Sequence, residues 1–291
     1  MIRFPIVTTA LGIDIGGTSV KLCVLGSQSQ PLFARSQAYR RPDRDQLLRA
    51  IADASKDLAQ TPETIGICAP GIFDSNSGRF VTCINIPGLI GASLEDLAEA
   101  ARCQSARASL HTDAFSAAIG FHSHRGGFPG RALALSLGTG VGACVLDDGV
   151  PLHISGKSPG HFGQLDVSLD DEAPIGPDGG RGGLEAYIGL PALRSRFNLD
   201  GEELGRRVNA LTRTDQPLRA LARAIRIGHA MFRPDAVWLL GGIGQALATA
   251  SDELKALIDA DLTSLARPGR ELHFAAHAFH AAMGAAELGA R

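Results

Sequence analysis

Residues 11–25 read LGIDIGGTSVKLCVL, and residues 133–146 read LALSLGTGVGACVL. In both segments an apolar strand runs into a glycine-containing turn, and a second apolar strand follows. Gly16 matches Gly138, and the Cys-Val-Leu that ends at Leu25 matches the one that ends at Leu146 with a one-residue gap. Repetition of this kind indicates two copies of one strand-rich unit, each opening a domain. A chance similarity between two glycine-rich hairpins is the alternative.

Helical and buried-strand patterns alternate after each copy. The spacing of apolar residues predicts helices at 43–59, 94–102, 114–122, 184–197, 202–211, 216–232 and 250–265, and from about 279. Short apolar runs predict buried strands at 64–68, 108–111, 237–240 and 272–275. Such alternation indicates an α/β protein. Residues 156–183 form the one long irregular segment, and loops of that length are usually functional or disordered.

The composition narrows the function classes. The chain has 291 residues, of which 45% are apolar, and its formal charge is −2. This balance gives no electrostatic case for a nucleic-acid partner or a polybasic membrane anchor. No run reaches the ~20 apolar residues that a membrane helix needs, and the five cysteines form no Cys-x-x-Cys pair. We expect a cytoplasmic protein with no nucleic-acid and no membrane partner.

The first chemical motif is the turn of Asp14, Gly16, Gly17 and Thr18. Two glycines between strands allow a tight turn and leave backbone N–H groups uncovered, so that a polyphosphate can approach closely. Asp14 at the strand end could hold a hydrated Mg²⁺, which prefers carboxylate and phosphate oxygens. The alternative is a plain hairpin turn with an exposed aspartate.

The second half carries two related motifs. Gly138, Thr139 and Gly140 form a second glycine turn that leaves backbone N–H groups uncovered. The two turns together predict a nucleotide site with two phosphate-binding turns. Gly241 and Gly242 end a buried strand and open a helix, where they could pack against an adenosine. Glycine is also common in ordinary turns of this kind. None of these motifs is a P-loop or a dinucleotide-binding fingerprint.

Together, these segments resemble the ROK family of sugar kinases, within the actin/hexokinase/Hsp70-like ATPase superfamily. The resemblance covers nearly the whole chain in order, and rests on residues 14–18, 67–74, 85–88, 112–118, 137–142 and 179–187. It implies a two-lobed α/β fold of duplicated ribonuclease-H-like domains with a central nucleotide cleft. The implied N-terminal lobe is 1–115, completed by a returning helix at 278–291, and the C-terminal lobe is 116–277. Because the first chemical motif begins near residue 11, we expect no N-terminal winged helix of the kind that family repressors carry.

The resemblance also assigns roles to residues. Asp113 matches the family's catalytic aspartate, which would accept the proton of an acceptor hydroxyl. Its alternative role is helix N-capping. The matching substrate residues are Asn85, Thr112, Gln164 and Glu185; Asn85 could instead be a turn residue, and Glu185 a helix-start glutamate favoured by the macrodipole.

The chain departs from the family pattern around the acceptor. Thr112 stands where the family has Asn, Gln164 where it has Glu, and Val167 where it has His. His161, three residues before Gln164, is a substitute candidate for that histidine, against the alternative of a solvated loop residue. In the zinc segment, Gly176, Asp178 and Gly183 replace the ligand cysteines, so we expect no zinc site.

The sequence therefore predicts an ATP-dependent, Mg²⁺-assisted kinase of carbohydrate metabolism that phosphorylates a hydroxyl of a sugar or sugar-like acceptor. Asp14 would contact Mg²⁺ through water. Two alternatives stay open: a nucleotide- or sugar-binding protein with little or no kinase activity, and a polyphosphate-dependent sugar kinase. The expected partner is the small-molecule substrate, and a homodimer is compatible with the sequence.

Overall fold

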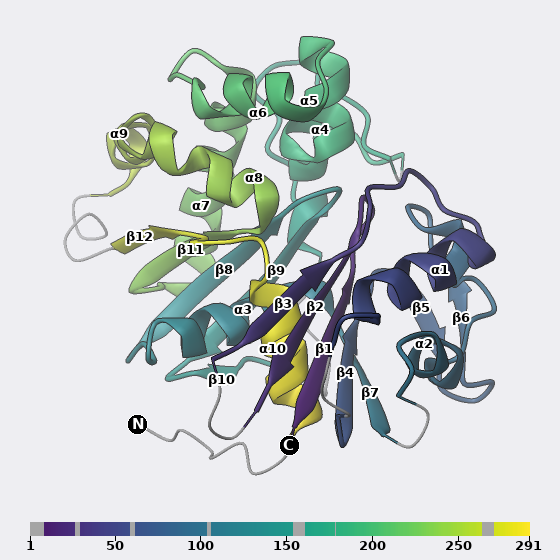
Figure 1. The fold of residues 1–291 in the computed structure, drawn as a ribbon. Helices are drawn as coiled ribbons and strands as arrows, with labels where there is room; N and C mark the ends of the chain where they lie inside the picture. The colour runs from purple at the N-terminus through teal and green to yellow at the C-terminus, as the bar shows by residue number, and fades with distance from the viewer. Residues whose placement is uncertain are drawn as a thin grey trace. The chain divides into compact units, whose positions relative to one another are not determined.

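The computed structural model describes residues 9–26, 30–58, 62–103, 106–153, 161–177, 179–263 and 271–291. They form two compact units, Met1–Gly127 with Phe279–Arg291, and Phe128–Ala278. Each unit is an α/β body built on one five-stranded sheet (Figure 1).

The sheet of the first unit has the strand order β3-β2-β1-β4-β7. Strands β1, β2 and β3 form an antiparallel meander, and β4 and β7 continue the sheet parallel to β1. The bounds are β1 Ala10–Ile15, β2 Val20–Leu25, β3 Leu32–Arg35, β4 Thr64–Cys68 and β7 Arg107–His111. A separate hairpin of β5 (Ile72–Asp74) and β6 (Arg79–Thr82) was not predicted from the sequence.

The sheet of the second unit repeats this topology, with the order β10-β9-β8-β11-β12. Its meander is again antiparallel, and β11 and β12 again run parallel to β8. The bounds are β8 Arg131–Leu137, β9 Val141–Asp147, β10 Val150–Pro151, β11 Ala236–Leu240 and β12 Glu271–Phe274. The predicted duplication is confirmed, because both sheets share one strand order and one set of strand directions.

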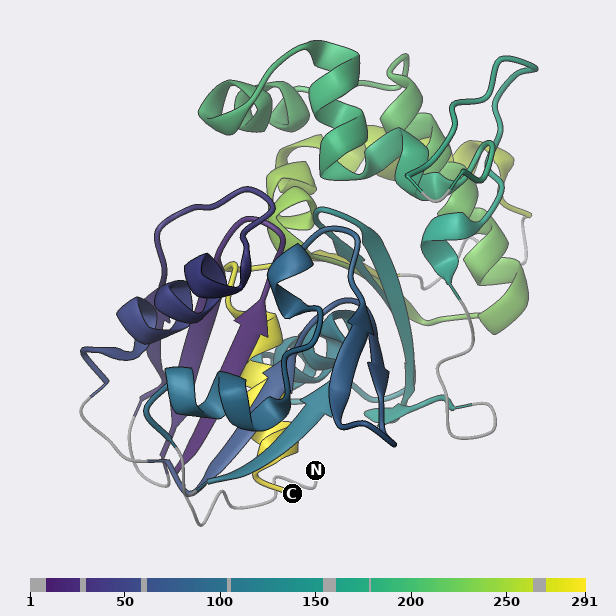
Figure 2. The same cartoon turned by 90° about the vertical axis from the view of Figure 1, so that its right-hand side faces the viewer.

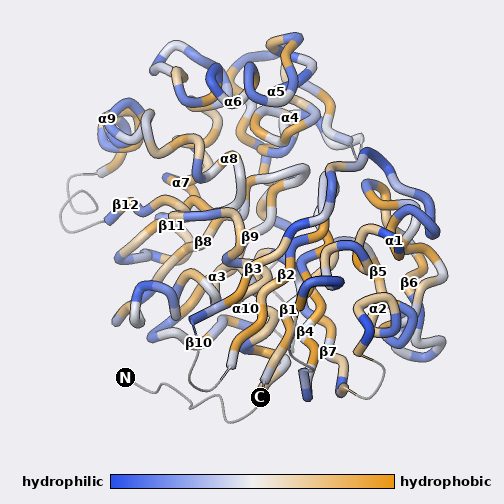
Figure 3. Tube along the Cα trace, in the orientation of Figure 1, coloured by the Kyte–Doolittle hydropathy of each residue, from blue (hydrophilic) through white to orange (hydrophobic). Residues whose placement is uncertain are grey.

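Helices cover both faces of the first sheet (Figures 1 and 2). One face packs its apolar side chains, including Ile13 and Ile67, against α1 (Arg44–Ser55) and α2 (Leu94–Ala100). The other face packs against α10 (His280–Gly289), which also contacts α3 (Asp113–His124). Strands β1 and β4 and helix α10 are coloured mostly hydrophobic in Figure 3, in keeping with a core between them.

Helix α10 packs closely because glycines, which have no side chain, lie at its contacts. A Cβ atom on Gly12 would lie 1.8 Å from the Ala282 carbonyl oxygen, and one on Gly284 would lie 1.8 Å from that of Ser116. Helix α3 therefore belongs with α10 in the first unit. The lobe boundary expected after residue 115 falls inside α3, whereas the first compact unit extends to Gly127.

The helices of the second unit enclose a core that includes Leu135, Tyr187 and Leu239. Their bounds are α4 Leu184–Ile188, α5 Leu190–Phe197, α6 Gly201–Asn209, α7 Gln216–Phe232, α8 Gly241–Ala246 and α9 Ser251–Asp261. The single helix predicted at 184–197 is two helices, because Gly189 is extended and Pro191 restarts the chain as an N-terminal helix residue. Among the described residues, no helix has the length and apolar character needed to cross a membrane.

Candidate active site

The candidate site of the first unit lies at the carboxyl ends of its parallel strands. The turn of Gly16–Thr18 follows β1, residues 69–71 follow β4, and Asp113 comes two residues after the end of β7. Carboxyl ends of neighbouring parallel strands share one edge of a sheet, and ligands of α/β proteins bind outside that edge. The topology thus brings together motifs that are about 100 residues apart in the sequence.

A row of polar side chains crosses the sheet just inside this edge. In strand order, directly paired residues are Arg35, Lys21, Asp14, Cys68 and His111. Paired residues of neighbouring strands lie on the same face. This face is the one that α10 covers, because the Cys68 thiol contacts the Ala281 carbonyl oxygen at 3.7 Å.

Asp14 is buried at the centre of the row. Its Oδ2 accepts a hydrogen bond from Lys21 Nζ at 2.8 Å, and its Oδ1 contacts the Cys68 thiol at 3.7 Å. Burial, and then the carboxylates of Asp14 and Asp113, hold the pKa of Cys68 well above its usual range, so the thiol stays protonated. The sequence analysis did not single out Lys21, although the register of the β1–β2 hairpin would have placed it opposite Asp14.

The glycine turn is held from outside by Tyr39. The Tyr39 hydroxyl donates to the Gly16 carbonyl oxygen at 2.6 Å, and the Tyr39 backbone N–H donates to that of Thr18 at 2.9 Å. Burial and the nearby Asp14 carboxylate raise the pKa of Tyr39, so this hydroxyl remains a donor. Two carbonyl groups of the turn are thus engaged by Tyr39, and the Gly16 N–H donates to the Ser19 carbonyl oxygen at 3.2 Å, so these contacts hold the shape of the turn. Tyr39 belongs to none of the sequence motifs, so its contact with the turn could not be predicted from the sequence.

Asp113 is the first residue of α3 rather than its N-cap. Thr112 occupies the N-cap position, and its side chain accepts from the Phe115 N–H at 3.4 Å. Asp113 Oδ1 accepts from the Ala114 N–H at 2.7 Å. Burial, followed by the Asp14 carboxylate, raises the pKa of Asp113, while the Lys21 ammonium opposes this effect. The two carboxylates are thus close enough to influence each other.

Asn85 lies between β6 and the short 3-10 helix η1 (Pro87–Leu89) and is partly buried. The neighbouring Cys83 acts electrostatically on Tyr39, as Asp14 does. Gly71 has a φ of 106°, and a Cβ there would lie 2.4 Å from the Thr82 carbonyl oxygen. The loop after β4 therefore packs against the end of β6 and Cys83, two residues before Asn85. Within the described residues, Asn85 makes no hydrogen bond to Asp113.

In the second unit, two predicted nucleotide segments share one sheet edge. Gly138–Gly140 follows β8, and Gly241 and Gly242 follow the adjacent parallel strand β11. Gly241 has a φ of 78° and packs so tightly that a Cβ would lie 2.4 Å from the Leu137 carbonyl oxygen. At Gly138 and Gly242 a Cβ would meet no atom of the described residues within 4 Å. Internal packing therefore does not require glycine at either position, and the space beside both backbones is open to a ligand.

Glu185 and Gln164 adjoin the first of these segments. Glu185 Oε2 accepts from the Val141 N–H at 2.8 Å, and a Cβ on Gly140 would lie 2.8 Å from the same oxygen. Gln164 ends the 3-10 helix η2 (Phe162–Gln164), and its side chain is exposed. A Cβ on Gly183 would lie 3.6 Å from the Gln164 Cα, so η2 packs beside the start of α4. The second unit therefore brings the predicted phosphate turn and two predicted substrate residues together.

Val167 lies in the apolar core, with no exposed surface. A histidine at this position would not reach a ligand without a change in the backbone. The chain therefore differs from the family pattern here both in the residue type and in the position of the backbone. The segment that resembles the zinc loop is closed by backbone bonds, among them Gly182 N–H to Pro174 at 2.8 Å and Gly176 N–H to Gly180 at 2.7 Å. Asp178 and residues 154–160 lie outside the described residues, whereas His161 lies within them and is exposed.

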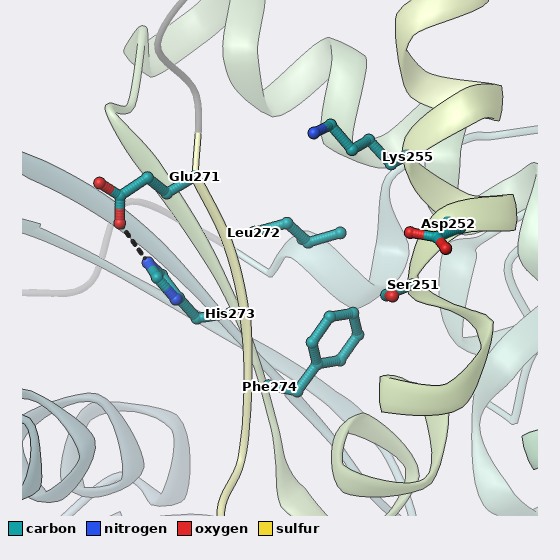
Figure 4. Close-up of a pocket in the computed structure, with 7 residues that line it drawn as sticks. All are labelled: Ser251, Asp252, Lys255, Glu271, Leu272, His273 and Phe274. Atoms are coloured by element: carbon teal, nitrogen blue, oxygen red, sulfur yellow. Dashed lines mark hydrogen bonds and ion pairs between the residues drawn. The ribbon is translucent and has the colours of Figure 1, made fainter.

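A separate hollow of about 470 Å³ lies between the start of α9 and β12 (Figure 4). Leu272 and Phe274 point toward α9, while Glu271 and His273 extend from the other side of the strand and pair at 2.5 Å. None of the predicted site residues lines it. Within the described residues, no group of three histidine, cysteine, aspartate or glutamate side chains is arranged to hold a metal ion.

The fold and the two edge sites define a duplicated α/β protein of the actin-like ATPase type. Comparison with protein families matches residues 10–291 to the ROK family, and the chain belongs to that family.

Two curated relatives are sugar kinases. The N-acetyl-D-glucosamine kinase of Erwinia tasmaniensis is 26% identical over 281 residues, or 89% of this chain and 92% of that protein. The glucokinase of Thermotoga maritima is 26% identical over 269 residues, or 81% and 82%. Matches to the N-acetyl-D-glucosamine kinases of Yersinia pseudotuberculosis span 61% of each chain. The Streptomyces griseus ROK glucokinase, solved with glucose and AMPPNP, superposes with a TM-score of 0.72 at 20% identity, covering 97% of this chain and 99% of that one.

Proposed function

We propose that this chain is an ATP-dependent sugar kinase in which Asp113 is the general base. Asp113 would take the proton from an acceptor hydroxyl as the terminal phosphoryl group of ATP is transferred to that oxygen. The turn of Gly16, Gly17 and Thr18 in the first unit, and that of Gly138, Thr139 and Gly140 in the second, would bind phosphates. Gly241 and Gly242 would line the adenosine.

One observation carries the proposal. Asp113 lies at the carboxyl edge of the first sheet, and its carboxyl group interacts electrostatically with Asp14 and Lys21 at the same edge. A carboxylate with a raised pKa beside an anion-binding turn is the arrangement that proton abstraction next to a phosphoryl acceptor requires. The names of the curated relatives support the sugar as the acceptor.

Magnesium fits Asp14 through water. Both Asp14 oxygens already have contacts, with Lys21 and Cys68, and the side chain is buried, so direct coordination would displace one of them. A hydrated ion held mainly by nucleotide phosphates needs only a carboxylate nearby. When bound, the ion would neutralise charge on the phosphates.

Glu185 and Gln164 in the second unit, and Asn85 and Thr112 in the first unit, are the residues that would contact the acceptor. Gln164 offers one acceptor oxygen and an added donor where a glutamate would offer two charged oxygens. We therefore propose that the preferred sugar presents a group suited to an amide, and that glucose is a poor substrate.

The proposal is tested by measuring sugar-dependent ADP release across a panel of hexoses, N-acetylated hexosamines and polyols, with ATP and with polyphosphate as donors. Phosphorylation of at least one sugar from ATP is the expected result. Turnover with polyphosphate but not with ATP would identify polyphosphate as the phosphoryl donor. Nucleotide binding without any turnover would favour a nucleotide-binding protein over a kinase. Sub-millimolar KM for glucose would contradict the proposed pocket.

A further inference from the structure

A lysine that the proposed reaction does not yet use lies beside the phosphate turn of the first unit. Lys21 Nζ lies 2.8 Å from Asp14 Oδ2, and 3.8 Å from the position that a Cβ on Gly16 would take. The ammonium group is therefore next to the backbone of the turn and not only beside the carboxylate. Its side chain is 16% exposed, so it is partly reachable from solvent.

Lys21 has hydrogen-bonding capacity to spare. An ammonium group carries three N–H donors, and Asp14 is the one acceptor that the described part of the chain provides for it. Two donors therefore remain for a ligand that reaches the exposed part of the side chain. The pair is too sheltered to be a simple surface ion pair, whose side chains would be solvated and worth little.

A cation would stabilise the negative charges that meet at this edge of the sheet. The Asp14 carboxylate disfavours the negative charge of Asp113 and helps to raise the pKa of Asp113. A terminal phosphoryl group that approaches Asp113 adds further negative charge. The Lys21 ammonium is close enough to act on Asp113 electrostatically, so it would also act on a phosphoryl group placed between Asp113 and the turn.

The neighbouring strand fixes this lysine in place. Arg35 pairs with Lys21 across β2 and β3, and its Nε donates to Ser19 Oγ at 3.0 Å. Arg35 thus holds the end of the turn, and its own positive charge on the outer side favours an ammonium that points inward to Asp14.

We propose that Lys21 is a ligand of the terminal phosphoryl group of the nucleotide. The inference rests on the proposed function, because it takes ATP as the donor. It adds a residue that recognises the group being transferred, as distinct from the adenosine and the sugar.

Nucleotide binding without metal tests this role. Affinities for AMPPNP and AMP are measured by calorimetry in EDTA for the wild-type chain, Lys21→Met and Lys21→Arg. Lys21→Met should weaken AMPPNP by about tenfold or more, as expected for a lost charge-assisted hydrogen bond, and change AMP by less than about twofold. Lys21→Arg, which keeps the charge, should retain most of the AMPPNP affinity. Lys56→Met removes the same charge from the exposed end of α1 and should change neither.

The outcomes separate this inference from the proposed function. Equal loss of AMPPNP and AMP, or no loss of either, would overturn the role of Lys21 alone. A wild-type chain that binds no AMPPNP with or without Mg²⁺ would overturn the ATP donor and this inference together. If Lys21→Met melts far below the wild type, Asp14→Asn is compared with Asp14→Asn/Lys21→Met, which removes both buried charges; equal AMPPNP affinities in that pair would again contradict the role.

Discussion

The Glu185 carboxylate accepts a hydrogen bond from the backbone N–H of Val141 at 2.8 Å. Val141 is the first residue of β9, directly after the Gly138–Gly140 turn, and it is buried. One side chain at the start of α4 therefore fixes the end of the predicted phosphate turn. A residue predicted to bind sugar also has a structural contact, and the two roles can be separated by substitution.

We expect Glu185→Ala to lower the free energy of unfolding by about 1–3 kcal/mol, because it leaves the buried Val141 N–H unpaired. Glu185→Gln keeps an acceptor oxygen and should stay close to the wild type in stability, while both variants should bind sugar more weakly. Chemical denaturation and sugar KM values check this. Glu203→Ala, at an exposed position of α6, is the control. Equal denaturation midpoints for Glu185→Ala and the wild type would refute the structural part.

Asp113→Asn should lower kcat by roughly 10²–10⁴ while the fold survives, since the amide keeps an oxygen for the Ala114 N–H and loses the basicity. Steady-state kinetics with the best sugar of the panel measure the effect, and circular dichroism confirms folding. Unchanged turnover would show that Asp113 is not the base.

The acid limb of kcat/KM should have its midpoint above the ordinary aspartate pKa of about 3.9, because burial raises the pKa of Asp113 and the base must be ionised. Folding raises the pKa of this carboxyl group. Such a group contributes fully to stability at pH values below its unfolded-state pKa, and this contribution is lost as the pH rises through its folded-state pKa. Asp113→Asn should therefore melt at a higher temperature than the wild type at pH 7, and the difference should shrink at acid pH.

Thermal melts between pH 4 and pH 8 follow this difference. Asp53→Asn, at an exposed position of α1, should show no comparable pH-dependent gap. A gap for Asp113→Asn that grows toward acid pH would have the wrong sign for this account.

Two glycine substitutions should have opposite effects on stability. Gly284→Ala places a Cβ 1.8 Å from the Ser116 carbonyl oxygen and should destabilise the chain by about 1–3 kcal/mol or more. Gly205→Ala, in α6, meets no atom within 4 Å and should stabilise it by about 0.4–1 kcal/mol. Denaturation midpoints report both changes, and the same sign for the two variants would contradict the packing of α10.

Gln164→Glu should raise kcat/KM for glucose roughly 5- to 30-fold, or about 1–2 kcal/mol. A carboxylate accepts hydrogen bonds from sugar hydroxyls more strongly than an amide does. The exposed position should tolerate the change. Val167→His should not extend this gain, because it places an imidazole in the apolar core and should lower stability instead. Kinetics with glucose and thermal melts of both variants check the two statements. Better glucose use by Val167→His would mean that the loop can repack.

The buried strands and the duplication were predictable because glycine turns and apolar runs are local signals. The break at Gly189 and the hairpin of β5 and β6 were not predicted, since they follow from short segments with weak periodicity. Of the candidate site, the motif residues Asp14 and Asp113 could be named from the sequence. Lys21 was not named, although the register of the β1–β2 hairpin would have placed it opposite Asp14. Tyr39 could not be named, because its role depends on a contact across 23 residues. The burial of Val167 likewise required the packed core.

The packing of α10 on Gly12 and Gly66 also sets a sequence of events during synthesis. Residues 279–291 are synthesised after residues 128–278, yet they complete a unit whose other strands and helices come before residue 128. Until they emerge, the α10 face of the first sheet has no covering helix of its own, while residues 128–278 already contain a whole unit. The unit of residues 128–278 should therefore be able to fold before the first unit is complete, and the emergence of residues 279–291 is the step that lets the Asp14 and Asp113 edge form.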